Sequence, residues 1–177
     1  MVLFWNFMIY SFLGFLLEVA YARATGGRPN RKCLWVLPLC PVYGLGACLI
    51  LALSPPVTPY PPAVFLLGAL TATGAEYLAA VYYETLLGVS FWDYRDLPGN
   101  FQGRVCLPFS LAWGVLSLPL VYWLHPLLSP LLGEIPAPVG YAALAALLAD
   151  LLLSALLLRR HRDIGCLRWY AHKKTAG

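Results

Sequence analysis

Five apolar stretches, each about 20 residues long, constrain the fold of this 177-residue chain more than any other feature. They cover residues 2–21, 34–53, 63–83, 105–124 and 139–158. A helix needs about 20 apolar residues to cross the hydrocarbon core of a bilayer. We therefore predict an all-α integral membrane protein with five transmembrane helices. The transmembrane domain is expected over residues 1–158, with a basic cytoplasmic tail over residues 159–177.

The composition excludes a water-soluble monomer. Hydrophobic residues make up 60% of the chain and charged residues 11%, against about 45–50% and about 25% in an ordinary soluble domain. The net charge of +4 does not indicate nucleic-acid binding, because the few basic residues flank the apolar stretches instead of forming one patch.

The positions of Lys and Arg predict how the chain lies in the membrane. The loops at residues 54–62 and 125–138 contain neither residue type. All twelve basic residues fall on the other side: Arg23, Arg28, Arg31, Lys32, Arg95, Arg104, Arg159, Arg160, Arg162, Arg168, Lys173 and Lys174. Because basic loops stay in the cytoplasm, we expect the N-terminus outside and the C-terminus inside. The tail is expected to contact anionic lipid headgroups.

Common catalytic and metal-binding patterns are missing from the sequence. The five cysteines include no C-x-x-C pair, so neither a disulfide framework nor a zinc site is predicted. No P-loop or metalloprotease signature occurs. We therefore expect no metal and no cofactor, and any ATP-driven process would require a separate ATP-binding subunit.

A weak internal repeat relates two predicted hairpins. Residues 37–44 (LPLCPVYG) resemble residues 107–114 (LPFSLAWG) at an offset of 70. The first and third spans each carry one acid, Glu18 and Glu76. We predict two similar hairpins forming a parallel repeat, followed by a fifth helix, in which Gly44 and Gly114 occupy equivalent positions. Tyr43, within the repeat, is interpreted as an interfacial aromatic residue.

Acidic side chains inside the apolar stretches are the strongest candidates for a site. Each costs about 2.5–3.5 kcal/mol at the bilayer centre. Glu18, Glu76 and Asp150 all lie toward the cytoplasmic ends of their spans, and Glu84 closes the third span. We predict a polar cavity open to the cytoplasm and lined by these acids, with Arg104 as counter-ion. The alternative is that the acids pair with arginines and only fix the packing of the helices.

The loop at residues 91–104 combines aromatic, charged and amide side chains with turn residues. This composition predicts a shaped loop that folds back toward the protein, and not a flexible linker. The candidate binding residues are therefore Glu18, Glu76, Glu84, Trp92, Asp93, Tyr94, Asn100, Arg104 and Asp150. Arg104 is expected to contact Asp93, Glu76 or Glu84.

The motif W-D-Y at 92–94, followed by N-x-x-G-R-x-C-L-P-F-S-x-x-W-G over residues 100–114, resembles the ABC-transporter type IV family of bacterial multi-spanning membrane proteins. YSFLGFLLE at 10–18 and CPVYG at 40–44 resemble the opening spans of that family. A more distant similarity is to a small eukaryotic transmembrane family with a W-D-Y loop. The resemblance implies a protein of the bacterial plasma (inner) membrane that acts as a component of a transport system.

Three functions fit these observations. The first is a transport or permease-type component whose acidic cavity binds a cationic or polyhydroxylated group. The second is a membrane-embedded enzyme acting on a lipid or lipid-linked substrate, with Glu76 or Asp93 as general base and Arg104 holding a phosphate or carboxylate. The third is a scaffold or assembly subunit. Small residues spaced four apart, such as Ala142 and Ala146, predict close helix contacts within the chain or in a homodimer.

Overall fold

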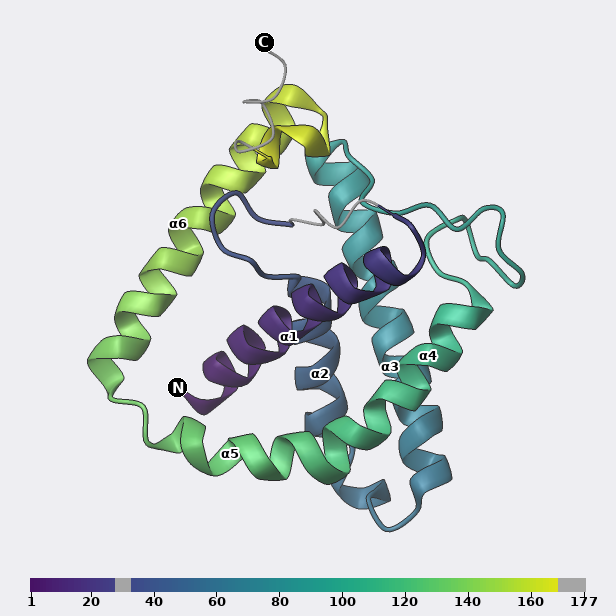
Figure 1. Cartoon of the computed structure of the whole chain (residues 1–177), viewed down its shortest axis with the longest axis vertical. Coiled ribbons are helices and arrows are strands. Elements are labelled where there is room, and N and C mark those ends of the chain that lie inside the picture. The colour runs from purple at the N-terminus through teal and green to yellow at the C-terminus, as the bar shows by residue number, and fades with distance from the viewer. Residues whose placement is uncertain (28–32, 169–177) are drawn as a thin grey trace.

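The computed structural model of the protein describes residues 1–27 and 33–168, and these residues contain helices, connecting loops and no strand. The helices are α1 (Val2–Ala24), α2 (Pro41–Leu53), α3 (Pro61–Tyr82), α4 (Leu107–Pro119), α5 (His125–Gly133) and α6 (Ala137–His161). A π-helical turn, Tyr83–Leu87, extends α3, and a second, Leu120–Leu124, joins α4 to α5. Figure 1 shows α6 along the left side of the molecule and α5 along its lower side. Helices α1 to α4 fill the middle and the right side.

The predicted class, an all-α membrane protein, is confirmed. Four helices are long and apolar enough to cross a membrane: α1, α3 with its π turn, the continuous helix Leu107–Gly133, and α6. α2 is also apolar but has 13 residues, which gives a length of about 20 Å at 1.5 Å per residue. This is shorter than the hydrocarbon core of about 30 Å. The described part of the chain therefore has four helices of spanning length and a shorter apolar one, where the sequence predicts five spans of similar length.

Two prolines explain why the second helix is short. The expected span begins at residue 34, but residues 34–40 are not helical and α2 starts at Pro41. Proline is favoured at the first position of a helix because its missing N–H would have no partner there. Pro38 also disfavours helical geometry at Leu37. The segment before α2 therefore follows an irregular path.

The fourth span is longer than predicted. The expected helix ends at residue 124, whereas the helical region continues through α5 to Gly133. Pro119 lies at the end of α4 and is followed directly by the π turn. Proline removes one backbone hydrogen bond and bends a helix, and Figure 1 shows that α5 runs in a different direction from α4. The helix therefore bends at Pro119 without ending.

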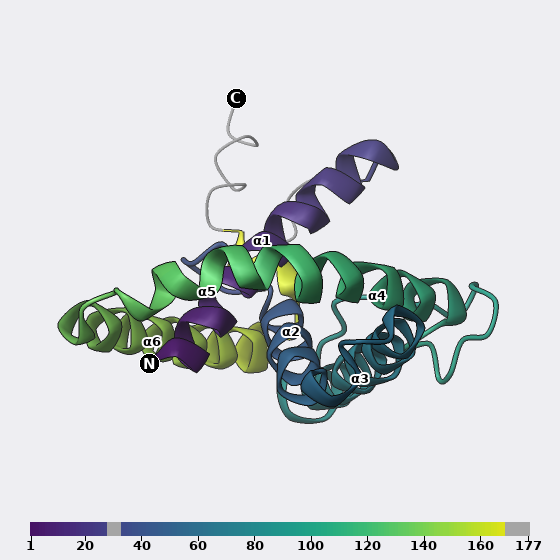
Figure 2. The ribbon, with the colours of Figure 1, turned by 90° about the horizontal axis from the view of Figure 1, so that it is seen from below.

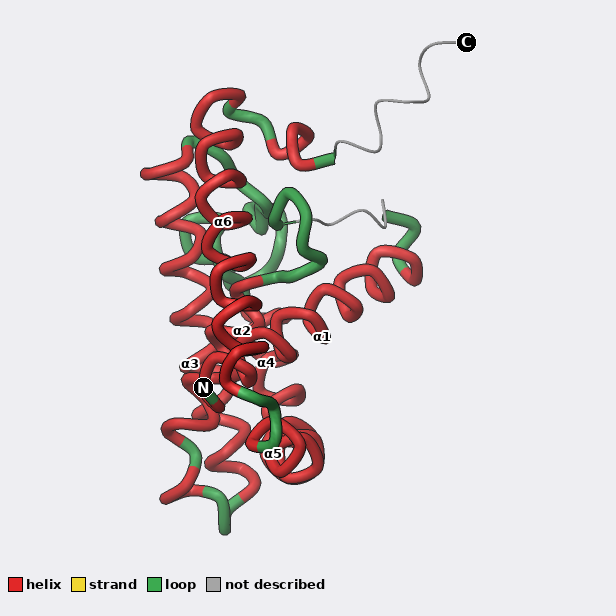
Figure 3. Tube along the Cα trace, turned by 90° about the vertical axis from the view of Figure 1, so that its left-hand side faces the viewer, coloured by secondary structure: helices red, strands yellow, loops and turns green. Residues whose placement is uncertain are grey.

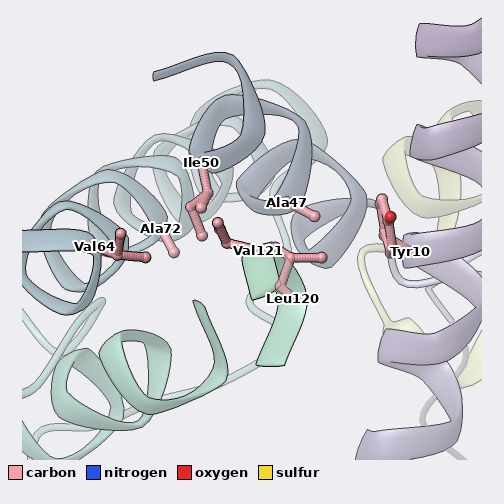
Figure 4. Packing of buried hydrophobic residues seen from close by; sticks show 7 residues of the cluster. All are labelled: Tyr10, Ala47, Ile50, Val64, Ala72, Leu120 and Val121. Carbon is pink, nitrogen blue, oxygen red and sulfur yellow. The ribbon is translucent and has the colours of Figure 1, made fainter. Parts of the chain in front are cut away.

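Helices α1 to α4 pack in chain order, α1 on α2, α2 on α3 and α3 on α4. Figure 2 shows the C-terminal half of α1 tilting away from the other helices. The main cluster of buried apolar residues draws on α1, α2, α3 and the π turn after α4 (Figure 4). Its members are Tyr10, Ala47, Ile50, Val64, Ala72, Leu120 and Val121. This core fixes the relative positions of the four helices that carry the site.

One end of the molecule is rich in loops. The segment before α2 and the loop between α3 and α4 both lie there, away from the turn between α2 and α3 (Figure 3). We call this the loop-rich end. Arg23 lies in the last turn of α1, and Arg95 and Arg104 belong to the loop after α3. Arg159 and Arg160 lie in the last turn of α6, Arg162 directly follows that helix, and Arg168 follows a short 3-10 turn.

The division into a transmembrane domain up to residue 158 and a tail after it stays a prediction. α6 continues to His161, and the 3-10 turn Ile164–Leu167 folds back so that Leu167 is fully buried. The remaining predicted basic residues, Arg28, Arg31, Lys32, Lys173 and Lys174, lie outside the described residues. The predicted contact of the whole tail with headgroups therefore stays a prediction.

Candidate functional site

Two carboxylates from different helices each accept a hydrogen bond from an aromatic side chain of the next helix. The hydroxyl of Tyr43 on α2 donates to Oε1 of Glu18 on α1 at 2.8 Å. Nε1 of Trp113 on α4 donates to Oε2 of Glu76 on α3 at 2.9 Å. The structure thus pairs each hairpin's acid with the aromatic residue that directly precedes Gly44 or Gly114 in the sequence repeat.

Gly14 lets Tyr43 reach Glu18. A Cβ atom at Gly14 would lie 2.2 Å from Cγ of Tyr43, so any side chain there would displace the ring. Gly14 and Glu18 are four residues apart and share one face of α1. The Tyr43 ring therefore packs on the backbone of α1 and extends its hydroxyl to the acid one turn further on.

Glu76 is almost completely buried, with 5% of its surface exposed. Besides Trp113 it contacts Tyr94 of the loop, whose hydroxyl donates to Oε1 at 2.9 Å. Each carboxylate oxygen therefore has a donor, which is what a buried carboxylate requires. Burial raises the pKa of Tyr94 above its ordinary value, so this phenol stays protonated and keeps its hydrogen atom to donate.

Both acids line a cavity of about 90 Å³ at the loop-rich end. A single buried water needs about 10–15 Å³ by this kind of measure, so several waters or a small polar group fit. The lining combines the two acids with many aromatic rings and one basic side chain: Glu18, Cys33, Cys40, Val42, Tyr43, Glu76, Phe91, Trp92, Tyr94, Phe109, Ala112, Trp113, Leu116, Ile164 and Arg168.

The aromatic rings of this cavity pack in pairs. Tyr43 and Trp113 have ring centroids 4.8 Å apart. Tyr94 stacks on Phe109 at 4.9 Å with an angle of 20° between the rings. Such ring pairs contribute about 0.5–1.5 kcal/mol of stability in addition to the burial of their apolar surface. The rings that hold the acids are therefore themselves fixed by their neighbours.

Local hydrogen bonds within the loop bring Tyr94 to the cavity. The Trp92 indole donates to the Arg104 carbonyl at 2.8 Å, and the Tyr94 amide donates to the Gly103 carbonyl at 2.8 Å. Gly103 has a φ of 71°, a conformation that glycine adopts without strain. The Asn100 amide donates to the carbonyls of Arg95 and Leu97. Asn100 therefore holds the shape of the loop from outside the cavity.

Arg104 pairs with Glu84 and not with the cavity acids. Its Nε and Nη2 donate to Oε2 of Glu84 at 2.8 and 2.7 Å, and it also contacts Gln102 and Tyr77. These hydrogen bonds, first of all the one to Glu84, raise the pKa of Arg104. Among the described residues, no hydrogen bond or ion pair joins Arg104 to Glu76 or Asp93. Neither Arg104 nor Glu84 lines the cavity.

Asp93 lies on the surface of the loop. It forms an exposed ion pair with Arg95 at 2.5 Å, and this contact lowers the pKa of Asp93. Asp93 and Glu84 border a shallow outer hollow that Trp92 also lines. Of the predicted site residues, the structure therefore brings Glu18, Glu76, Trp92 and Tyr94 into one cavity and leaves Glu84, Asp93, Asn100 and Arg104 outside it.

Asp150 supports the irregular segment before α2. Its carboxylate accepts hydrogen bonds from the backbone N–H groups of Val36 at 3.1 Å and Leu37 at 2.6 Å. Ser154, one turn further along α6, accepts the N–H of Trp35 at 2.8 Å. Asp150 is not part of the cavity lining. Asp150 therefore fits the alternative that a buried acid only fixes the packing of the helices. Its partners, however, are backbone amides and not an arginine.

The sequence analysis did not select Tyr43, Trp113 and Phe109 as site residues. Tyr43, interpreted as an interfacial residue, instead points to Glu18. The repeat contained the signal, since Tyr43 and Trp113 occupy matching positions in it. Cys33 and Cys40 were also not selected, and their sulfur atoms lie 3.3 Å apart in the cavity wall. The described residues contain no group of three or more potential metal ligands.

These features define a helical protein with several helices of membrane-spanning length and a cavity lined by two acids and several aromatic rings. The chain belongs to the family described as “Putative ABC-transporter type IV”, whose sequence model matches residues 5–157. This confirms the predicted family. Comparison with curated proteins and with solved structures gave no significant match.

Proposed function

We propose that this protein is a membrane component of a transport system and that the Glu18–Glu76 cavity binds the transported group. The observation that carries the proposal is the meeting of two carboxylates, from two helices, in one cavity near the loop-rich end. Membrane-embedded acids are costly and usually mark substrate or ion pathways. Two carboxylates in one cavity favour a cationic or polyhydroxylated group. The family's description as an ABC transporter fits this role.

An internal repeat supports the proposal. Tyr43 and Trp113 are 70 residues apart, Glu18 and Glu76 are 58 apart, and both pairs form the same acid–aromatic hydrogen bond. A Cβ atom at Gly44 would contact Phe7, and one at Gly114 would contact Phe65, again 58 residues further. Substrate sites between structural repeats are common in transporters. We propose that the two hairpins are such repeats and that the cavity lies between them.

ATP would act through another protein. The sequence has no phosphate-binding loop, so a separate ATP-binding subunit would dock on the cytoplasmic loops. We place the loop-rich end in the cytoplasm and the N-terminus outside, in a bacterial plasma membrane, because basic residues favour the cytoplasmic side. The enzyme alternative would require Arg104 near Glu76 or Asp93, and the Arg104–Glu84 pair does not favour it.

The charge and accessibility of the cavity can be tested by thiol labelling. In a cysteine-free background, Ala112→Cys places a thiol in the cavity lining. We expect a small cationic thiosulfonate to label it at least tenfold faster than an anionic one of similar size, because carboxylates attract cations. Labelling should occur in inside-out membrane vesicles and not in intact cells. The second variant Glu76→Gln should reduce the ratio of the two rates severalfold.

The matched control for this experiment is Asp96→Cys, on the exposed surface of the loop. It should label from the same side with a smaller preference for the cation. Gly99 is less suitable, because its φ is 63° and a Cβ atom there would lie 2.8 Å from Leu107. Equal rates for both reagents at Ala112→Cys would contradict an acidic cavity, and labelling from outside intact cells would contradict the orientation.

A further inference from the structure

We infer that the group bound in the cavity is the alkylated ammonium head of a cationic amphiphile, whose apolar chain lies in the groove next to the cavity between α2, α3 and α6. This inference rests on the proposed function and narrows it to a class of substrate. Two independent features carry it. One is the chemistry of the cavity wall, and the other is an apolar groove that shares two lining residues with the cavity.

The cavity wall has the composition of a site for alkylated ammonium groups. Six of its fifteen lining residues are aromatic: Tyr43, Phe91, Trp92, Tyr94, Phe109 and Trp113. Ring faces attract cations, and quaternary ammonium groups are commonly recognised by cages of aromatic residues. Glu76 adds a buried carboxylate in the same wall. The wall also contains one basic side chain, Arg168, so the ring faces together with Glu76, and not net charge alone, would hold a cation without N–H groups.

The hydrogen bonds of the wall argue against a polyhydroxylated ligand. Both oxygens of Glu76 already accept a bond from Tyr94 or Trp113, and the Tyr43 hydroxyl already donates to Glu18. A sugar-like group needs donors and acceptors that are available to it. Tyr43, Tyr94 and Trp113 donate to the acids. The Trp92 indole donates to the Arg104 carbonyl, so these ring donors of the wall are all engaged. A cation can approach the Glu76 carboxylate without displacing those bonds.

An apolar groove of about 520 Å³ adjoins the cavity. Cys33 and Val42 line both spaces, so the two spaces are neighbours, and a ligand that passes these two side chains would occupy both. Leucines and alanines form much of the groove wall, among them Leu45, Leu49, Leu78, Ala79, Leu151 and Ala155. Such a wall matches an alkyl chain. A charged head in the cavity and an alkyl chain in the groove would satisfy both surfaces with one molecule.

Binding of four probes to the full chain in lipid nanodiscs tests this inference. The probes are octyltrimethylammonium, tetramethylammonium, octyl sulfate and octyl glucoside, and the readout is the fluorescence of the cavity tryptophans. We expect octyltrimethylammonium to bind at least tenfold more tightly than each of the other three. Glu76→Gln should weaken both cations at least tenfold. Ala79→Phe, which fills the groove, should weaken only octyltrimethylammonium, to about the level of tetramethylammonium.

Ala146→Phe is the control for groove filling, because Ala146 is exposed on α6 and does not line the groove. It should leave all affinities unchanged, which shows that a large side chain weakens binding only when it lies in the groove. Ala155→Phe replaces Ala79→Phe if that variant does not fold.

The possible results separate the inference from the proposed function. Equal affinity for the two cations, or equal binding of octyl glucoside and octyltrimethylammonium, would overturn the inference while leaving a ligand-binding cavity. If no probe bound more tightly to the wild-type protein than to the Glu76→Gln variant, the proposed function would be overturned as well.

Discussion

Replacing Gly44 by alanine is expected to destabilise the protein by about 3 kcal/mol, at the upper end of the usual range for overpacking. A Cβ atom there would lie 2.1 Å from the Ser11 hydroxyl oxygen and 2.6 Å from the Phe7 carbonyl oxygen. The carbonyl belongs to the backbone of α1 and cannot rotate away. The helices α1 and α2 would have to separate, which would also move Tyr43 from Glu18. Reversible unfolding in mixed detergent micelles measures the loss.

Two other glycines provide matched controls. A Cβ atom at Gly74 on α3 would meet nothing within 4 Å, and one at Gly46 would meet Ala72 at 3.5 Å, an ordinary contact. Alanine is favoured over glycine in a helix by about 1 kcal/mol. Gly74→Ala should therefore be neutral or slightly stabilising, and Gly46→Ala should be near neutral. Equal stability of the Gly44 and Gly74 variants would contradict the close packing of α1 on α2.

Replacing Asp150 by alanine is expected to cost about 3 kcal/mol, because a buried N–H that loses its acceptor costs about 1–3 kcal/mol. The Asp150 carboxylate serves two backbone amides, those of Val36 and Leu37, and it is 5% exposed. Asp150→Asn should lose less stability, because the side-chain carbonyl oxygen of asparagine can still accept a hydrogen bond from a backbone amide. The same unfolding measurement applies, and hydrogen exchange should show faster exchange of the Leu37 amide.

Glu134 is the control acid, because it is exposed at the end of α5. Glu134→Ala should change stability by less than about 0.5 kcal/mol, as expected for a surface position. Asp150→Ala should also leave the affinity of the cavity for cations within about twofold once the protein is folded. A folded Asp150→Ala protein with normal stability and no cation binding would place Asp150 in the binding site, against the present structure.

The sequence predicts the helical class because hydropathy and length determine what can cross a bilayer. It does not predict the shape of the second and fourth spans, because proline has two opposite outcomes there. Pro41 begins a helix, whereas Pro119 is followed by a π turn and the helix continues. In a membrane protein, neighbouring groups can satisfy the backbone atoms that proline frees. Which outcome occurs depends on tertiary contacts that local sequence does not contain.

The cavity acids could be found from the sequence because a carboxylate in an apolar span is costly. Their hydrogen-bond partners Tyr43 and Trp113 lie on the following helices; the repeat marks the two residues as equivalent but does not show that they contact the acids. For the same reason, the sequence alone does not distinguish Asp150 from Glu76. Both are buried. Asp150 accepts hydrogen bonds from backbone amides, whereas Glu76 accepts them from aromatic side chains in a cavity. The partner of Arg104 was narrowed to three acids, and the structure identifies Glu84.

Native mass spectrometry of the full chain, released from membrane without delipidation, tests the central claim most directly. The Glu18–Glu76 cavity is predicted to retain a cationic molecule, visible as a defined mass added to the wild-type protein. The double variant Glu18→Gln/Glu76→Gln should lose this added mass while keeping the ordinary phospholipids that surround any membrane protein. Identical spectra for the wild-type protein and the double variant would contradict the account.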